Sequence, residues 1–327
     1  MFPPGAVVML TAAVRDLHLA FPGQFLTDVR TSALALWLNN PWITPLEEDD
    51  PEVQIIDCDY PLIHRSNSVP YHFMHAFIEH LSYRLGVAFG PTRHGGDVHI
   101  SPQEAQYMSQ VEEITGWDIP FWIMAPGWNS KFTVKHWSAA RYQQVIDAFR
   151  GRLMFVQVGH SSPQQPRLSG VLDLTGRTNL RQLIRLVYHS QGVLCPVNLV
   201  MHLSAAVKTT SGDHRRPSVI VAGGREPPQW EAYPHHQYLH TVGALSCCAN
   251  GGCWRARTFA FGDDTAYDQP KRLCVDIVGK LPRCMHMIRS ADVVKAIERY
   301  FDGGVVSYLK PEQVAACASA IRAKTYT

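Results

Sequence analysis

The 327-residue sequence contains no apolar run close to the roughly 18 residues that a membrane-spanning helix needs. It also lacks an excess of charge of either sign, because 30 Lys and Arg residues face 28 Asp and Glu residues. A net charge of +2 provides no broad field that would hold a nucleic acid or an anionic membrane. We therefore expect neither a transmembrane segment nor a nucleic-acid partner, and any bound anion must be held by local groups.

A convincing secretion signal is also missing. Residues 6–14 are apolar, but no basic residue precedes them, and Arg15 and Asp16 follow directly. This pattern predicts a cytoplasmic protein.

Three common sequence motifs are absent as well: GxGxxG, GxxxxGK[ST] and GxSxG. Their absence argues against three interpretations: an oxidoreductase with a dinucleotide-binding domain, a P-loop protein, and a hydrolase with a nucleophile elbow.

What the sequence does contain is enough apolar material for sizeable cores, with 46% hydrophobic and 18% charged residues. The length corresponds to about two domains. Apolar stretches bounded by turn residues alternate with segments of helical periodicity. The expected strands are residues 7–10, 25–29, 53–56, 121–125, 153–158, 192–196 and 218–222. The expected helices are residues 11–21, 34–39, 70–85, 137–149, 180–189, 201–207, 291–301 and 311–324, with an acidic helix start over residues 101–113.

Unbroken apolar strands between helices are typical of parallel sheets that are buried on both faces. We therefore predict an α/β fold with two Rossmann-like lobes, whose parallel sheets face a central cleft. The predicted divisions are a first lobe over residues 1–115, a second over residues 116–305 and a C-terminal helix over residues 306–327. The second lobe includes a cysteine module over residues 246–286. Ligands of such sheets bind beyond the carboxyl ends of the strands.

Three loops at these strand ends carry candidate binding residues. The first loop, residues 125–137, contains Lys131 and Lys135, which suit a phosphate near a helix N-terminus but could also be solvated lysines. The second contains His202, which could donate to a phosphate or a sugar hydroxyl but could equally be structural. The third combines Gly224, which permits close backbone approach, with Arg225, which could clamp a diphosphate.

Five of the eight cysteines lie between residues 247 and 284. In a reducing compartment such a cluster favours a metal over disulfides, and four thiolates form a closed tetrahedral site for zinc or iron. The spacing favours Cys248, Cys253, Cys274 and Cys284 as ligands, with Cys247 as the substitute for Cys248. A closed site of this kind is structural, and the alternative is a set of buried free thiols.

Three histidines, His235, His236 and His240, precede this cluster. They could line the nucleotide end of a cleft, although we favour ordinary surface and helix residues.

The order of these segments resembles that of glycosyltransferase family nine, the ADP-heptose-dependent heptosyltransferase-like enzymes. The similarity extends over nearly the full length and lies in the segments 4–17, 21–23, 36–42, 71–73, 135–137, 201–206 and 223–226. It implies a GT-B fold, an N-terminal acceptor lobe, a C-terminal nucleotide-sugar lobe, and inversion at the anomeric carbon without a catalytic metal.

The resemblance also suggests roles for single residues. Lys135 matches the phosphate-binding lysine of the family's Lys-x-Trp motif, and His202 matches the histidine of its donor loop. Lys131 and Arg225 are predicted to bind the donor on the basis of local chemistry and not of the resemblance. The loop before His202 departs from the family's Asp-Ser/Thr-Gly, since Val197-Asn198-Leu199 stands here. Asn198, Met201 and Gly224 complete the predicted donor site.

A larger departure concerns the general base. Family members carry Gly-Asp at the end of the first strand, and that Asp is their proposed base, whereas this chain has Gly5-Ala6. A methyl group cannot accept a proton. Ala6 therefore indicates a natural pseudoenzyme, a base recruited from elsewhere such as Asp16 or Asp28, or an engineered substitution. We favour the last, since the surrounding motif is well kept.

The sequence thus predicts an inverting glycosyltransferase that moves a sugar, namely a heptose, from a nucleotide diphosphate to a hydroxyl acceptor. ADP-heptose is the expected donor, and the acceptor is a glycan, a protein or a small molecule. The cysteine cluster is similar to the four-Cys iron-binding module of bacterial autotransporter heptosyltransferases. The alternative is a catalytically silent sugar-nucleotide-binding or scaffold protein, in which the cysteine module supports a homo-oligomer.

Overall fold

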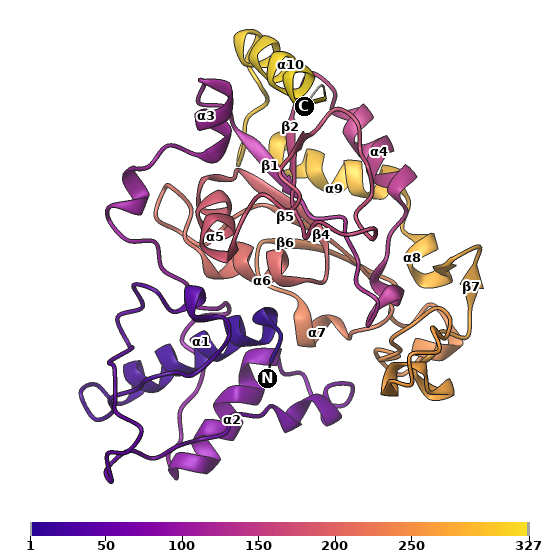
Figure 1. Cartoon of the computed structure of the whole chain (residues 1–327). Helices are drawn as coiled ribbons and strands as arrows, with labels where there is room; N and C mark the ends of the chain where they lie inside the picture. Colours follow the sequence, from indigo (N-terminus) through magenta and orange to yellow (C-terminus); the bar gives the residue numbers. More distant parts are fainter. Residues whose placement is uncertain (1, 326–327) are drawn as a thin grey trace.

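The computed structural model describes residues 2–325 and is built around one six-stranded sheet (Figure 1). All of its strand pairs are parallel, in the order β3-β2-β1-β4-β5-β6. The strands are β1 (Phe121–Met124), β2 (Met154–Gln157), β3 (Leu172–Asp173), β4 (Gly192–Pro196), β5 (Ser218–Gly223) and β6 (His236–His240). The α/β class and its parallel sheet are confirmed.

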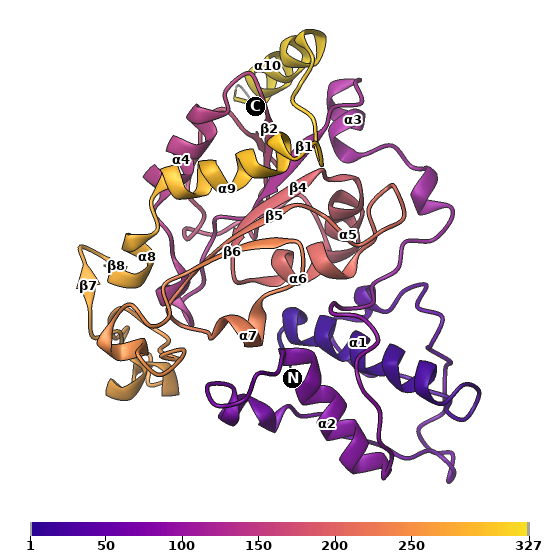
Figure 2. The same ribbon diagram turned by 180° about the vertical axis from the view of Figure 1, so that it is seen from behind.

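Helices cover both faces of this sheet (Figures 1 and 2). The helices α4 (Ala139–Ala148) and α9 (Ser290–Asp302) pack together on one face, while α5 (Leu180–His189) and α6 (Leu199–Ala206) lie on the other. Every residue of β1, β2, β4 and β5 is buried, as the apolar runs predicted. These strands and helices match the elements that the sequence predicts between residues 121 and 301.

Local signals explain where several helices begin and end. Asn179 caps α5 by accepting from the backbone N–H of Gln182, whose side chain accepts from the N–H of Asn179 in return. The helix α2 (Phe73–Leu85) ends at Gly86, which adopts the left-handed conformation with φ of 68°. The predicted helix over residues 70–85 is thereby confirmed, and so is the C-terminal helix, α10 (Pro311–Thr325).

The first region of the chain differs from the prediction. Residues 7–10 are not a strand, because they lie inside the helix α1 (Pro4–Ala20), which begins with Pro4 in its first turn. Residues 25–29 contribute only a single bridge, between Thr27 and Ile43. Residues 53–56 form a loop, and of residues 34–39 only the 3-10 turn η1 (Leu34–Leu36) is helical. Among residues 2–115 the structure therefore contains no sheet, and the expected sheet of the first lobe is wrong.

The physical reason is that a short run of apolar residues does not by itself distinguish a strand from a helix. Residues 6–14 are apolar almost throughout and contain no turn residue, so the run fits a buried helix as well as a buried strand. A strand must also pair with a neighbour to satisfy its backbone groups, and no neighbouring strand forms in residues 2–115.

Several shorter elements were not predicted. They are η2 (Pro61–Arg65), η4 (Thr133–Lys135), α7 (Pro228–Glu231), η5 (Ser246–Cys248), η6 (Ala266–Asp268), η7 (Pro270–Arg272), β7 (Ile277–Val278), β8 (Leu281–Pro282) and α8 (Arg283–Met287). The acidic helix start expected over residues 101–113 is divided between η3 (Glu104–Gln106) and α3 (Gln110–Thr115). The edge strands β3 and β6 were also missed. His236 and His240 lie in β6, so the expected helix positions are wrong, whereas His235 and His240 are exposed, as the preference for surface residues predicted.

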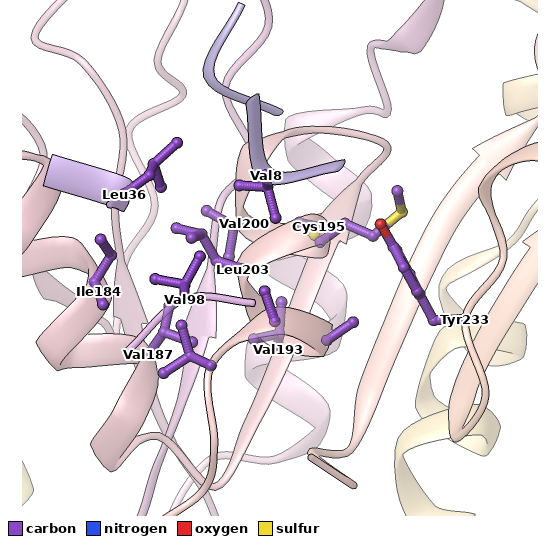
Figure 3. Close-up of a cluster of buried hydrophobic side chains, with 14 of the residues drawn as sticks. Val8, Leu36, Val98, Ile184, Val187, Val193, Cys195, Val200, Leu203 and Tyr233 are labelled. Carbon is purple, nitrogen blue, oxygen red and sulfur yellow. The ribbon is translucent and has the colours of Figure 1, made fainter. Parts of the chain in front are cut away.

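One apolar core joins the first region to the sheet. Figure 3 shows Val8 of α1 and Leu36 of η1 gathered with Ile184 of α5 and with Val200 and Leu203 of α6. The two regions approach so closely that a side chain at Gly96 would have its Cβ 3.0 Å from Cβ of Ala206 in α6. Helix α1 thus packs onto α6, and α2 packs onto α1, rather than onto a sheet of their own. No helix within residues 2–325 has the length and apolar character that crossing a bilayer requires.

Candidate functional site

The candidate site lies beyond the carboxyl ends of three neighbouring strands, β1, β4 and β5. The loop after β1 carries Lys135, the helix after β4 carries His202, and the segment after β5 carries Arg225, Glu226 and Glu231. Because these strands are parallel and adjacent, their following loops meet at one edge of the sheet. The topology therefore brings together residues that are far apart in the sequence.

Two cations share one buried carboxylate at this edge. The Nζ of Lys135 lies 2.6 Å from Oε1 of Glu226, and Arg225 pairs with the same oxygen. Glu226 is only 1% exposed. Burial alone would raise the pKa of Glu226, but the charges of Arg225 and Lys135 together hold this pKa below its ordinary value. The group of three carries one net positive charge, which suits an anionic ligand.

Aromatic rings fix the guanidinium of Arg225. Its central carbon lies 4.6 Å from the ring centre of Phe132 and 5.1 Å from that of Trp254. Its Nε donates to the carbonyl oxygen of Arg255 at 2.7 Å. Phe132 also lies beneath the ammonium of Lys135, 5.5 Å from its centre. Both cations are therefore held in place before any ligand arrives.

A second polar group adjoins the first and reaches the amino end of α1. The Nδ1 of His202 lies 2.6 Å from the hydroxyl of Tyr233, and its Nε2 lies 3.7 Å from Oε2 of Glu231. The imidazole ring also faces Gly5, where a Cβ would come within 2.9 Å of Cδ2. A side chain at Gly5 would therefore collide with this histidine.

Burial shifts both titratable groups of this pair toward their neutral forms. Burial, with a smaller contribution from Lys135, lowers the pKa of His202 to about 3. Burial and the nearby charge of Glu226 raise the pKa of Glu231 to about 8. A carboxyl group whose pKa lies near neutrality can take up or release a proton under physiological conditions.

The other residues that the sequence predicts for the donor site have surroundings unlike those of Lys135, His202 and Arg225. Asn198 caps α6, because its Oδ1 accepts from the N–H groups of Val200 and Met201. Met201 itself is fully buried in the core. Lys131 is exposed, and its ammonium takes no part in the ion group around Glu226. Gly224 faces the cysteine module, where a Cβ would lie 3.2 Å from Sγ of Cys248.

Ala6, which occupies the position of the expected base, lies in the first turn of α1 and is 4% exposed. Sequence reasoning missed Glu226, Glu231 and Tyr233 as site residues. The available signal was the placement of two acidic residues directly after a fully apolar strand, in a segment rich in Pro and Trp.

The predicted metal ligands surround the loop after β5. Cys248 and Cys284 both lie against Gly224, and the N–H of Cys253 donates to the carbonyl oxygen of Gly224 at 3.1 Å. Burial, and then the neighbouring thiols Cys253 and Cys274, raise the pKa of Cys284 to about 12. Burial also raises the pKa of Cys247, Cys253 and Cys274.

The geometry nevertheless assembles no ligand set. Across residues 2–325, no three His, Cys, Asp or Glu side chains are placed to hold a metal ion together. The Sγ of Cys248 donates to the carbonyl oxygen of Leu245 at 3.4 Å, and that of Cys274 donates to Asp276 at 3.3 Å. The thiols thus share one neighbourhood without the arrangement of a zinc or iron site, and a bound metal stays a prediction.

Comparison with solved structures identifies the fold as GT-B, the fold of glycosyltransferase family nine. A family nine glycosyltransferase from Veillonella parvula DSM 2008 matches 91% of this chain and 94% of its own, with a TM-score of 0.57 and 15% identity. The iron-containing dodecameric heptosyltransferase TibC, in complex with ADP-D-β-D-heptose, matches 93% of this chain and 74% of its own, with a TM-score of 0.56 and 17% identity. E. coli heptosyltransferase WaaC with ADP matches 92% of this chain and 96% of its own, with a TM-score of 0.51 and 12% identity.

Sequence comparison adds nothing to this result. No family model matches the chain, and no curated protein matches it significantly. At 12% to 17% identity the structural matches establish the fold. Function must be argued from the site itself.

Proposed function

We propose that this protein is an inverting glycosyltransferase that moves a sugar from a nucleoside diphosphate donor to a hydroxyl acceptor. The observation that carries this proposal is the buried group of Lys135, Arg225 and Glu226 at the carboxyl ends of the strands. A departing diphosphate develops negative charge on its oxygens, and fixed cations in a water-poor site stabilise that charge. The overall likeness to heptosyltransferase structures supports the same conclusion.

The group of Lys135, Arg225 and Glu226 is arranged so that a donor phosphate can replace the carboxylate of Glu226 as the partner of a cation. In the free protein Glu226 neutralises one of the two cations, and Lys135 also donates to the carbonyl oxygen of Val197 at 3.4 Å. Donor phosphates would take over contacts of Lys135, while the fork of Arg225 can hold phosphate oxygens in pairs. Within this proposal the donor is ADP-heptose, because solved structures of this fold hold ADP or an ADP-heptose.

The proposal is tested by calorimetry with ADP, UDP, GDP and ADP-heptose. Loss of a charge-assisted hydrogen bond costs about 1.5–3 kcal/mol, so Lys135→Met should weaken ADP binding by about 10-fold to 100-fold. Lys310→Met, which removes an exposed lysine outside the site, is the matched control and should change the Kd less than twofold. Absence of binding to all four ligands would overturn the proposal, whereas selectivity for UDP or GDP would change only the donor.

A silent sugar-nucleotide-binding protein is the second candidate, and Ala6 favours it because the methyl group at this position accepts no proton. Such a protein would bind ADP-heptose and release no ADP. Ala6→Asp, placed in the first turn of α1 beside the site, separates the two functions when ADP release is measured for both chains. Release by the unaltered chain supports the transferase, and release only by the variant supports the silent protein.

A further inference from the structure

We propose that Glu231 is the general base, the group that takes the proton from the acceptor hydroxyl. This inference rests on the proposed transfer reaction and names the residue that performs the step for which Ala6 is unsuited. Three observations support it: the engagement of Asp16 and Asp28, the unpaired oxygen of Glu231, and its position near both the cation group and the amino end of α1.

The two aspartates nearest in sequence are already engaged. Asp16 is fully buried, pairs with Arg15 at 2.9 Å, and accepts from the hydroxyl of Thr92 at 2.6 Å and from its N–H at 3.2 Å. Asp28 pairs with Arg30 and accepts from the N–H groups of Val29 and Leu46. To take up a proton, either aspartate would have to give up the contacts that stabilise its negative charge. Neither aspartate is therefore free to act as the base.

Glu231 differs from both because one of its oxygens has no partner. It is 5% exposed, and its Oε2 makes no hydrogen bond within the described part of the chain. A buried polar atom without a partner costs free energy and calls for an explanation. A site built to receive a hydroxyl proton supplies one, because the missing hydrogen bond is the one that the acceptor brings.

The position of Glu231 is equally specific. The Nε2 of His202 lies 3.7 Å from Oε2 of Glu231, and a Cβ at Gly5 would lie 3.4 Å from the same Nε2. The charges of Lys135, Arg225 and Glu226 also act on Glu231. Glu231 therefore lies near both the group that would bind the diphosphate and the amino end of α1, whose first turn contains Ala6.

Contacts of α7 with the first region hold Glu231 in this place. Trp230 stacks on Phe73 of α2, with 5.1 Å between ring centres, and Gln229 donates to the carbonyl oxygen of Ser66 at 3.0 Å. Both views show α7 beside the amino ends of α1 and α2 (Figures 1 and 2). An acceptor bound by the first region would thus present its hydroxyl to a carboxylate carried by the second.

The reaction balances with these groups alone. The carboxylate of Glu231 takes the hydroxyl proton as the acceptor oxygen forms a bond to the anomeric carbon. The bond from that carbon to the diphosphate oxygen breaks, and its electron pair leaves with the nucleoside diphosphate beside Lys135 and Arg225. The pKa of Glu231, raised to about 8 by burial and by Glu226, makes its carboxylate a stronger proton acceptor than an ordinary one.

The test measures ADP release from ADP-heptose, with water and glycerol as hydroxyl acceptors. Glu231→Gln keeps the shape and removes the proton acceptor, so the release rate should fall at least 100-fold while the Kd for ADP stays within twofold. Glu231→Asp, which keeps a carboxylate further from the substrate, should retain an intermediate rate. Glu79→Gln, an exposed carboxylate on α2, is the matched control and should release ADP at the unaltered rate.

The outcomes separate this inference from the function on which it rests. If none of ADP, UDP, GDP and ADP-heptose binds, the proposed function itself fails; if UDP or GDP binds instead, the same release assay is made with the corresponding sugar conjugate. If ADP-heptose binds and Glu231→Gln releases ADP at the unaltered rate, Glu231 is not the base and the transferase stands. If the donor binds and the unaltered chain releases no ADP above the buffer rate, the inference is also overturned, in favour of the silent protein. If Glu231→Gln does not fold, an unaltered rate for Glu231→Asp overturns the inference, and a reduced rate with unchanged ADP affinity supports it.

Discussion

The two regions of this molecule reach a buried core by different means. Residues 116–325 carry a parallel sheet whose central strands are buried on both faces, so this region contains most of its own partners. Residues 2–115 carry two long helices, three short 3-10 turns, the short α3 and loops, and their apolar side chains are covered partly by one another and partly by α5 and α6 of the other region. The first region therefore depends on the second for burial, and the candidate site lies where they meet.

The contacts that stabilise the first region and the residues of the candidate site therefore lie at the same boundary between the two regions. The core on the side of α1 includes residues of both regions, whereas the core under α4 and α9 belongs to the second region alone. Contacts that join the regions also position α7, which carries Glu231. Changes at the boundary should consequently affect both regions at once.

The largest effect is expected from Leu203→Ala, within the cluster that joins α1 to the sheet. Removing a fully buried leucine side chain should lower the free energy of unfolding by about 2–5 kcal/mol. Because the core is shared, chemical denaturation should still show one transition for both regions. Leu19→Ala, at an exposed position of α1, is the control and should cost little. Two separated transitions would show that the regions fold independently.

A smaller effect is expected from Asn67→Ala, which removes a paired contact between the regions. The side-chain amide of Asn67 donates to the carbonyl oxygen of Gly252 and accepts from its N–H, both at 2.9 Å. Loss of both bonds should cost about 1 kcal/mol and speed the modification of Cys253 by a thiol reagent, since Gly252 precedes that residue. Asn250→Ala changes an exposed amide of the same module and should alter neither quantity. Equal modification rates in all three chains would contradict a role for Asn67 in holding the module.

The smallest effect concerns pH. Arg181 of α5 donates to Glu104 of the first region at 2.6 Å and to the carbonyl oxygen of His99 at 2.8 Å. The hydrogen bond from Arg181 lowers the pKa of Glu104 from 4.5 to about 2. Because the folded pKa is the lower one, the stabilisation is complete above pH 4.5 and disappears as the pH falls toward 2.

Glu104→Gln should therefore lower the melting temperature slightly at pH 6, by less than about 1 kcal/mol in free energy, since the pair is partly exposed. As the pH falls through 2, the melting temperatures of the variant and the unaltered chain should converge. A difference that persists or grows under acid would rule out this ion pair as its source.

Local patterns predicted most of the second region. The apolar runs of β1, β2, β4 and β5 and the capped, periodic helix α5 carry their own signals, because a period of two or of 3.6 residues and a cap are properties of neighbouring residues. The same patterns were ambiguous for residues 7–10, which form part of α1. A short strand such as β6 exists only because β5 lies beside it.

The candidate site divides in the same way. The sequence by itself determined that Lys135, His202 and Arg225 follow strands of a parallel sheet, and parallel strands end at one edge. Only the tertiary structure decided that Glu226 joins the two cations, that Glu231 lies beside His202, and that the amino end of α1 packs against that histidine. These contacts depend on how distant segments pack. Burial then sets the protonation state of each group, and no local pattern of residues encodes that burial.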